Sequence, residues 1–247
     1  MKKIIIALLA MLTIFMAPNI YAKSFGVGKN KKGQRPNIED KIITDNNGFF
    51  FGEDNKNIYL TFDCGYENGY TKGILDVLRE TNTKACFFIT GHYLKSSKDL
   101  VRQMIDDGHI IGNHTYSHKD FTKSTNEEIL ADIRKLEDEF YKDMGVKLSN
   151  YVRPPRGEYS LESQKLLSDN DYKSVFWSLA YLDWNKDVYN GNHYSYNKVM
   201  NKIHNGAIIL MHTVGKDNMV DLKDIIIDLK EEGYVFSSLD EIWYNIL

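Results

Sequence analysis

Cysteine and proline are scarce in this sequence, with only two cysteines and four prolines among 247 residues. Two cysteines exclude a small scaffold held together by many disulfides. We expect Cys64 at the end of one strand and Cys86 near the start of the next. The Cα atoms of a disulfide lie within about 7 Å of each other, so this placement argues against a bond between them.

An excess of positive charge is also absent, since 31 Lys and Arg residues face 34 Asp and Glu residues, for a formal net charge of −3. Proteins that bind nucleic acid depend on neutralising its phosphates with basic side chains. The charge balance therefore argues against a nucleic-acid partner. The basic stretch "KNKKGQR" at 29–35 is local, and we interpret it as part of a solvated arm.

After residue 17 no apolar run is long enough to suggest a membrane span. The one apolar run, "IIIALLAMLTIFMA" at 4–17, follows the basic start "MKK" and precedes the small residue Ala22. This order is typical of a secretory signal peptide, which we predict over residues 1–22, with an uncleaved anchor as the alternative. We therefore expect an exported protein, located in the cell envelope or another extracytoplasmic space.

Two common catalytic motifs are missing. The sequence contains neither the GxSxG motif of many serine hydrolases nor the GxxxxGK[ST] phosphate-binding loop. A cysteine protease built from Cys64 and His212 is conceivable. However, the expected strand-end position of Cys64 offers nothing that would lower the pKa of its thiol.

Two regions follow the predicted signal peptide. Residues 23–56 are rich in Lys, Asn, Gly and Asp, and we predict an N-terminal extension that packs through Phe49 to Phe51. Residues 57–247 form one domain in which apolar strands alternate with amphipathic helices, two of them at 125–144 and 218–232. Strands are predicted at 57–63, 85–90, 109–113, 151–154, 173–179, 206–212 and 234–238. This alternation predicts a parallel sheet, arranged as a distorted (β/α) barrel of about seven strands.

Polar residues follow these predicted strands repeatedly, and they could carry chemistry. In parallel α/β folds the active site is built at the carboxyl ends of the strands. The pattern therefore predicts an enzyme with its site at this edge. The residues are Asp63, His114, Arg153, Asp183 and His212.

His114 and His118 are spaced i, i+4, which on a helical turn places both imidazoles on one face, within reach of one metal ion. The alternative is a pair of polar loop histidines. A catalytic zinc ion usually has three protein ligands, so Asp63 and Cys64 are candidates for the third.

An acid, a base and their partners can also be assigned. Arg153 leaves the end of an apolar strand and needs a carboxylate partner, for which we predict Asp63; a structural ion pair with another acid is the alternative. His212 ends a very apolar strand, where a histidine with a nearby carboxylate can act as a general acid or can simply be a buried structural residue. We interpret the remaining histidines as structural: His92, His109, His193 and His204.

The stretches "TFDCG", "HTYSH", "RPPRG", "DW" and "LMHT", in this order, resemble the polysaccharide deacetylases, the NodB-homology domains of carbohydrate esterase family 4. The resemblance covers roughly residues 55–245. It implies a distorted barrel, a single divalent metal ion, often zinc, and removal of acetyl groups from N-acetylated sugars. By similarity Asp63 is the base and Arg153 is its orienting partner. His212 is the acid, Asp183 is the carboxylate that tunes the acid, and His114 and His118 are the metal ligands. Leu210 forms the wall for the acetyl methyl group, Trp184 and Arg156 make further substrate contacts, and the Arg156 backbone N–H faces the oxyanion.

The sequence departs from the family at Cys64, where most members have an aspartate that binds the metal. Cys64 could be a thiolate ligand, or metal could be dispensable. Cys64 could also be a bystander, with two histidines and water holding an exchangeable ion, and we favour this third hypothesis.

"TFDCGYENGYT" and Arg156 resemble a subgroup that deacetylates N-acetylmuramic acid of peptidoglycan and leads to muramic δ-lactam in the spore cortex. A guanidinium at position 156 suits the lactyl carboxylate of that sugar. We therefore expect a monomer that acts on glycan strands, after an amidase has removed stem peptides, in a compartment such as the forespore intermembrane space. The alternatives are a deacetylase of N-acetylglucosamine in peptidoglycan or chitin, and a non-catalytic glycan-binding module.

Overall fold

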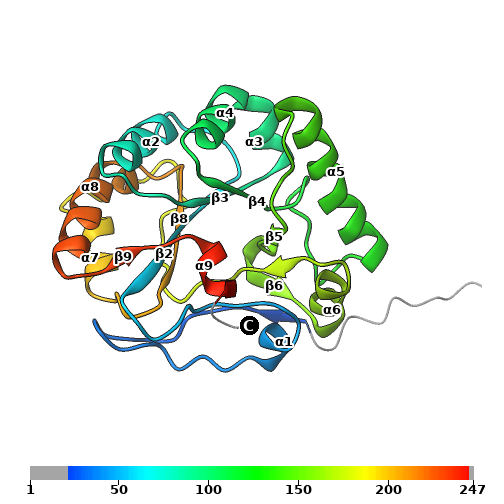
Figure 1. Ribbon diagram of the computed structural model, residues 1–247, viewed down its shortest axis with the longest axis horizontal. Helices are drawn as coiled ribbons and strands as arrows, with labels where there is room; N and C mark the ends of the chain where they lie inside the picture. Colours follow the sequence, from blue (N-terminus) through cyan, green and yellow to red (C-terminus); the bar gives the residue numbers. More distant parts are fainter. Residues whose placement is uncertain (1–21, 245–247) are drawn as a thin grey trace, which may run out of the picture.

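A computed structural model describes residues 22–244 as a parallel sheet surrounded by helices (Figure 1). The predicted signal peptide lies outside the described residues, apart from Ala22. Six strands follow one another across the sheet, and a seventh pairs with the first two residues of β2, all in parallel. Their order is β7 (Lys173–Ser174), β5 (Tyr151–Val152), β4 (Ile110–Asn113), β3 (Cys86–Ile89), β2 (Asn57–Cys64) and β8 (Ile208–His212), with β9 (Val235–Phe236) beside the start of β2. The predicted barrel class is confirmed.

The helices surround the sheet on its outer side, except that the last one lies across the end of the barrel where the strands begin, with Leu239 and Ile242 in the inner core (Figure 1). They are α1 (Lys41–Thr44), α2 (Thr71–Glu80), α3 (Gly91–Ser96), α4 (Lys98–Asp106), α5 (Asn126–Met144), α6 (Leu161–Asp169), α7 (Tyr194–Met200), α8 (Lys216–Glu231) and α9 (Leu239–Tyr244). The predicted helix at 125–144 is α5, which begins with a capping box between Thr125 and Glu128 and ends at Gly145, a residue with a φ of 75°. Among the helices of residues 22–244, none is long and apolar enough to cross a membrane.

Side chains along β2 alternate between the inside of the barrel and the apolar layer outside the sheet. Phe62 and Cys64 belong to the apolar layer between the sheet and its helices. Tyr59 belongs to the core inside the barrel, and Thr61 and Asp63 share its side of the strand. Asp63 and Cys64 are therefore neighbours in sequence whose side chains face opposite sides of the sheet.

The predicted strand at 173–179 is wrong for most of its length. Only Lys173 and Ser174 form a regular strand, while Val175 and Leu179 make single bridges, to Phe49 and Ile209 respectively. The reason is that the N-terminal extension takes the backbone groups of this segment. Phe49 donates its N–H to the Ser174 carbonyl, and its own carbonyl accepts the N–H of the residue after Val175.

The N-terminal extension closes the seam of the barrel, which is the gap between the two edge strands β7 and β8. Phe49 and Phe50 are buried, and Phe51 forms an antiparallel bridge with Ala207, which confirms packing through this aromatic patch. Further upstream, β1 (Lys23–Ser24) pairs with β6 (Glu158–Tyr159), next to the short 3-10 helix Pro155–Gly157. The extension thus contacts the loop that carries Arg156.

Candidate active site

The residues predicted to form the site gather at the carboxyl ends of the central strands. Asp63 pairs in register with His212 across β2 and β8, and Arg153 follows β5. The Nη1 atom of Arg153 lies 2.8 Å from Oδ1 of Asp63, and Nε2 of His114 lies 3.5 Å from Oδ2 of the same carboxylate. The expected gathering of these side chains at one edge is confirmed.

Arg153 holds Asp63 from inside the barrel. Its side chain is completely buried, and besides Asp63 it donates hydrogen bonds to Thr61 Oγ1 at 2.9 Å and to the backbone carbonyl of Val175 at 3.0 Å. The guanidinium also lies 4.2 Å from the ring centroid of Phe88. Because these contacts fix the guanidinium, its hydrogen bond holds the Asp63 carboxylate in one orientation.

The electrostatic surroundings keep Asp63 ionised. Burial by itself raises the pKa of this carboxyl, but the positive charge of Arg153 and its hydrogen bond outweigh it, so the pKa lies below its ordinary value. One oxygen is held by Arg153, and the other faces His114. Asp63 is thus an oriented carboxylate with an oxygen able to accept a proton.

His114 and His118 come together on a loop rather than on the predicted helical turn. The rings lie 5.0 Å apart between centroids at an interplanar angle of 73°. Thr115 and His118 have φ values of 63° and 57°, which break the helical path and turn the second ring back toward the first. The side chain of Asn113 accepts a hydrogen bond from the Thr115 N–H at 2.8 Å and fixes this turn.

The two imidazoles are neutral and suited to metal binding. Burial lowers the pKa of both rings, that of His118 to about 4. Nδ1 of His114 lies 2.9 Å from the Arg153 carbonyl, which can only accept, so Nδ1 carries the proton and Nε2 has a lone pair. That lone pair faces the ionised Asp63 carboxylate, an arrangement that a cation between them would stabilise.

Among residues 22–244, no group of three or more His, Cys, Asp or Glu side chains is arranged to hold a metal ion. The donor chemistry of His114 and His118 nevertheless fits a divalent cation that completes its coordination with water or substrate.

Cys64 lies outside this donor set. It is completely buried in the core between the sheet and the helices, and its sulfur accepts a hydrogen bond from Thr213 Oγ1 at 3.6 Å. Burial raises the pKa of the Cys64 thiol well above its usual value, and the side chain faces the opposite side of the sheet from Asp63. Cys64 and Cys86 are both free thiols, as the sequence predicted.

His212 and Asp183 form the second charged pair of the site. Nδ1 of His212 lies 2.7 Å from Asp183 Oδ1, and the His212 backbone N–H donates to Oδ2 at 2.8 Å. Burial alone lowers the pKa of the imidazole, but the Asp183 carboxylate outweighs it, so the pKa of His212 is raised above its ordinary value. With Nδ1 bound to Asp183, Nε2 is the ring atom available to a substrate.

Asn218 is a site residue that the sequence analysis missed. It is completely buried on α8, and its Nδ2 donates to Asp183 Oδ2 at 2.7 Å and to the His212 carbonyl at 2.8 Å. Its Oδ1 accepts hydrogen bonds from the hydroxyls of Tyr181 and Ser195 at 2.7 and 2.6 Å, which fixes the orientation of the amide. The sign of this residue in the sequence is that a polar side chain stands one turn before Leu222 on the apolar stripe of the helix.

Asn68 is a second missed residue, and it joins three loops around the site. Its Nδ2 donates to the Val214 carbonyl at 3.0 Å, just after β8, and to the Lys186 carbonyl at 3.3 Å. Asn68 itself lies in the loop after β2, so the loops following Asp63, Asp183 and His212 are tied together.

The three predicted substrate contacts lie around these pairs. Leu210 is buried on β8, two residues before His212 and therefore on the same side of the strand. Trp184 is 55% exposed, and its ring centroid is 5.9 Å from that of His212. Arg156 has a φ of 57° and ion pairs with Glu158 and Asp120 at 2.7 and 2.8 Å.

The other histidines have surroundings of their own. His109 and His204 are buried against aromatic rings, and His193 lies 3.5 Å from an Asp221 oxygen. His92 is exposed. The structural interpretation of these four residues stays a prediction.

Comparisons with known proteins agree with this geometry. The family model for polysaccharide deacetylase matches residues 52–175. The chain is 43% identical over 210 residues to the peptidoglycan-N-acetylmuramic acid deacetylase PdaA of Bacillus subtilis strain 168, across 83% of this chain and 79% of PdaA. The solved structure of that PdaA, a family 4 carbohydrate esterase, superposes with a TM-score of 0.88 at 40% identity, over 93% of this chain and 100% of PdaA.

A more distant relative is the peptidoglycan-N-acetylglucosamine deacetylase PgdA of Listeria monocytogenes strain 10403S. It is 31% identical over 189 residues, which cover 76% of this chain and 39% of PgdA. The family match, the identity to PdaA and the shared barrel together show that this chain belongs to the polysaccharide deacetylases of carbohydrate esterase family 4, hydrolases of N-acetyl amide bonds.

Proposed function

We propose that this protein is an exported deacetylase of N-acetylmuramic acid in peptidoglycan, whose product leads to muramic δ-lactam in the spore cortex. The observation that carries the proposal is the pairing of an ionised, oriented Asp63 with a His212 of raised pKa at the same edge of the sheet. A base and an acid facing one site suit hydrolysis of an amide. The 43% identity to PdaA supports the substrate class.

In this proposal Asp63 removes a proton from the water that attacks the acetyl carbonyl. Arg153 keeps the carboxylate ionised and aimed throughout. His212 donates its Nε2 proton to the departing amine, a poor leaving group without protonation, and Asp183 stabilises the imidazolium before that transfer. Leu210, one layer below His212, provides an apolar wall for the acetyl methyl group.

A divalent metal ion, zinc by family resemblance, would be held by His114 and His118 and would supply polarisation of the carbonyl and acidification of the water. Cys64 contributes to the core rather than to this donor set, in agreement with the bystander hypothesis. The Arg156 backbone N–H is assigned to the oxyanion by family resemblance.

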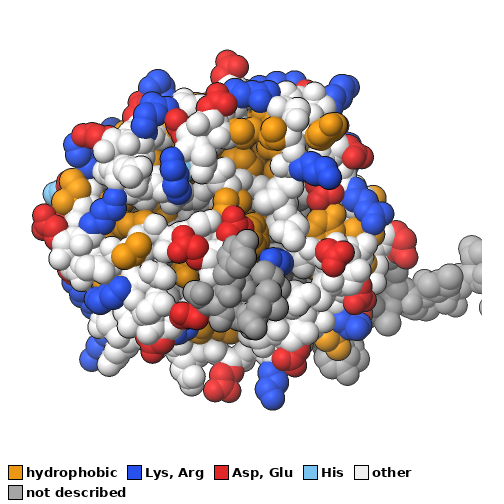
Figure 2. Space-filling model, viewed as in Figure 1, with side chains coloured by type: hydrophobic (Ala, Val, Ile, Leu, Met, Phe, Trp, Pro, Cys, Tyr) orange, Lys and Arg blue, Asp and Glu red, His pale blue; other side chains and the backbone are white. Residues whose placement is uncertain are grey.

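Arg156 supports muramic acid as the substrate. Its Nε and Nη2 atoms are held by Glu158, and Nη2 also contacts Asp120, while Nη1 makes no hydrogen bond with any residue that the structure describes. A fixed guanidinium with a free donor edge suits the lactyl carboxylate, which N-acetylglucosamine lacks. The face shown in Figure 2 carries Lys, Arg, Asp and Glu side chains interspersed, without the single-sign basic patch that a nucleic-acid partner needs.

Mass spectrometry of glycan strands, with and without stem peptides, tests the proposal after incubation with protein and zinc. Loss of acetyl from muramic acid is expected, and only from strands that an amidase has stripped of peptide. A further loss of water would show that the protein also closes the lactam. Acetyl loss from glucosamine would move the assignment to the alternative deacetylase, and the Asp63→Asn variant should be inactive.

The location and assembly remain parts of the same proposal. The predicted signal peptide supports export to the cell envelope, which for a cortex enzyme includes the forespore intermembrane space. A monomer is proposed, and size-exclusion chromatography with light scattering tests it. Binding of glycan strands without any acetyl loss would instead favour a non-catalytic module.

A further inference from the structure

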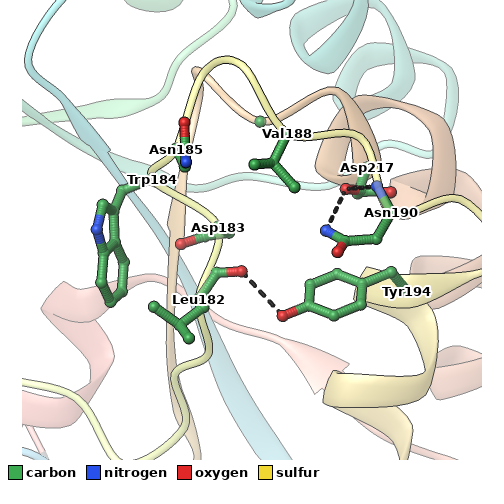
Figure 3. A pocket seen from close by; sticks show the side chains of 9 residues that line it. Leu182, Asp183, Trp184, Asn185, Val188, Asn190, Tyr194 and Asp217 are labelled. Carbon is green, nitrogen blue, oxygen red and sulfur yellow. Dashed lines mark hydrogen bonds between the residues drawn. The ribbon is translucent and has the colours of Figure 1, made fainter.

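Two of the loops that border the candidate active site are held in different ways. The segment that carries Asp183 and Trp184 is held by a contact within the domain, because the Tyr194 hydroxyl donates to the Leu182 carbonyl at 3.0 Å (Figure 3). The loop that carries Arg156 is instead held by the N-terminal extension, which is far away in sequence. None of the reaction steps proposed above uses this extension.

Arg156 has a backbone conformation that needs outside support. Its φ is 57°, and the φ of the following Gly157 is 66°. A positive φ is costly for a residue other than glycine and persists only where the surrounding structure fixes it. Arg156 therefore depends on the contacts that hold its loop in place.

The first strand of the extension supplies contacts of this kind. The backbone N–H of Phe25 donates to the Gly157 carbonyl at 2.8 Å. Ser24 pairs with Glu158 between β1 and β6, and the Glu158 carboxylate accepts hydrogen bonds from Nε and Nη2 of Arg156 at 3.0 and 2.7 Å. The extension thus fixes both the backbone that follows Arg156 and the carboxylate that holds its guanidinium.

Phe25 anchors this strand in the core. Its side chain is buried, and its ring lies 4.8 Å from that of Phe176 and 5.4 Å from that of Trp177 between centroids. A Cβ atom on Gly157 would come within 2.7 Å of the Trp177 ring and 3.2 Å of the Phe25 Cβ, so the loop packs directly on both residues. Removing the Phe25 ring therefore opens space under the loop that carries Arg156.

A second link joins the extension to the same loop. Tyr159 on β6 is buried, and its hydroxyl donates to Asp40 Oδ2 at 2.5 Å. The same oxygen accepts a hydrogen bond from Lys23 Nζ at 3.0 Å, and Oδ1 of Asp40 accepts the Ile42 N–H at the start of α1. The elements β1, α1 and β6 are therefore tied together at Asp40.

We propose that the first strand of the extension determines substrate specificity, with Phe25 as a positioning residue that acts through Arg156. The proposal rests on the proposed function, because it takes the carboxylate of an acidic sugar as the group that Arg156 binds. The extension precedes residues 52–175, which the family model matches, so this support comes from a part of the chain outside that match.

Calorimetric titration with N-acetylmuramic acid and with N-acetylglucosamine separates recognition of the carboxylate from the rest of binding. Phe25→Ala should weaken binding of N-acetylmuramic acid about tenfold, which is the contribution of a hydrogen bond to a charged group, and should leave binding of N-acetylglucosamine unchanged. Phe25→Leu keeps an apolar side chain under the loop and should recover most of the affinity. Leu229→Ala removes a buried side chain near the end of α8; it is the control for lost stability and should change neither affinity.

Repeating Phe25→Ala in an Arg156→Ala background tests whether Phe25 acts through Arg156. With the guanidinium absent, the substitution should weaken binding of N-acetylmuramic acid no further. An equal loss in both backgrounds would overturn the proposal, and so would unchanged affinity in Phe25→Ala alone. If Phe25→Ala does not fold, Tyr159→Phe takes its place with the same expected results, because it removes the link to Asp40 and keeps the buried ring.

Hydrogen exchange of the backbone amides gives a readout that needs no substrate. Phe25→Ala should speed exchange across residues 155–158 and leave the segment 182–190 unchanged, because that segment has its own support. Unchanged exchange at 155–158 would also overturn the proposal. If the natural protein did not prefer N-acetylmuramic acid to N-acetylglucosamine, the proposed function would be wrong, while hydrogen exchange would still decide whether Phe25 positions Arg156.

Discussion

Replacing Arg153 by methionine should separate the electrostatic part of the site from its packing. Arg153 is completely buried and hydrogen-bonds Asp63, Thr61 and two backbone carbonyls. Methionine keeps apolar contact with Phe88 but leaves Asp63 as a buried charge without its partner. Breaking a buried ion pair on one side costs about 3–5 kcal/mol, so we expect the free energy of unfolding to fall by about that amount.

Urea unfolding at pH 7, followed by tryptophan fluorescence, measures this loss. Arg79→Met is the matched control, because Arg79 forms an exposed ion pair with Asp107, and such pairs contribute little. Its unfolding midpoint should remain close to that of the natural protein.

A second substitution tests the reason for the loss. Adding Asp63→Asn to Arg153→Met removes the unpaired charge, so part of the lost stability should return, although neither variant should retain deacetylase activity. A loss below about 1 kcal/mol in Arg153→Met would refute the reasoning. So would a double variant that is less stable than Arg153→Met alone.

Three further predictions concern the acid and the cysteine. Asp183→Asn removes the charge that raises the pKa of His212, so the alkaline limb of kcat/KM and the NMR titration of this ring should move to lower pH. In the natural protein, the stability that the Asp183–His212 pair contributes is present at low pH and is lost as pH rises through the raised pKa of His212. Asn218→Ala frees Asp183 on one side and should lower kcat about tenfold or more with little change in KM, whereas equal kcat would show that Asn218 only packs. Cys64→Ser should leave zinc content, measured by plasma mass spectrometry, and activity unchanged; loss of zinc would make the thiolate a ligand after all.

Much of the fold could be predicted because the strands are short, apolar and separated by strongly patterned helices. The stripe on α5, from Ile129 to Met144, is buried as its spacing predicts. The segment 173–179 was misjudged because its backbone partners include Phe49, far away in sequence, and no local pattern records such a partner.

The candidate site could be predicted where a charged residue ends an apolar strand, as Asp63, Arg153 and His212 do. The conformation around His114 could not, because the positive φ values of Thr115 and His118 carry no signature in those residue types. Asn218 escaped notice for a different reason, since a single amide has no motif and its role depends on its neighbours in space.

The seam closed by Phe49 and Phe51 has a consequence for how the barrel folds. These residues pair with Val175 and Ala207, so the barrel closes only when the N-terminal part of the chain meets segments that come much later in the sequence. Contacts between such distant segments form slowly, because a long loop must be ordered before they can stabilise anything. Closure of the barrel should therefore be a late step in folding, and a chain that begins at β2 should collapse around its helices yet keep an open, unpaired edge that favours aggregation.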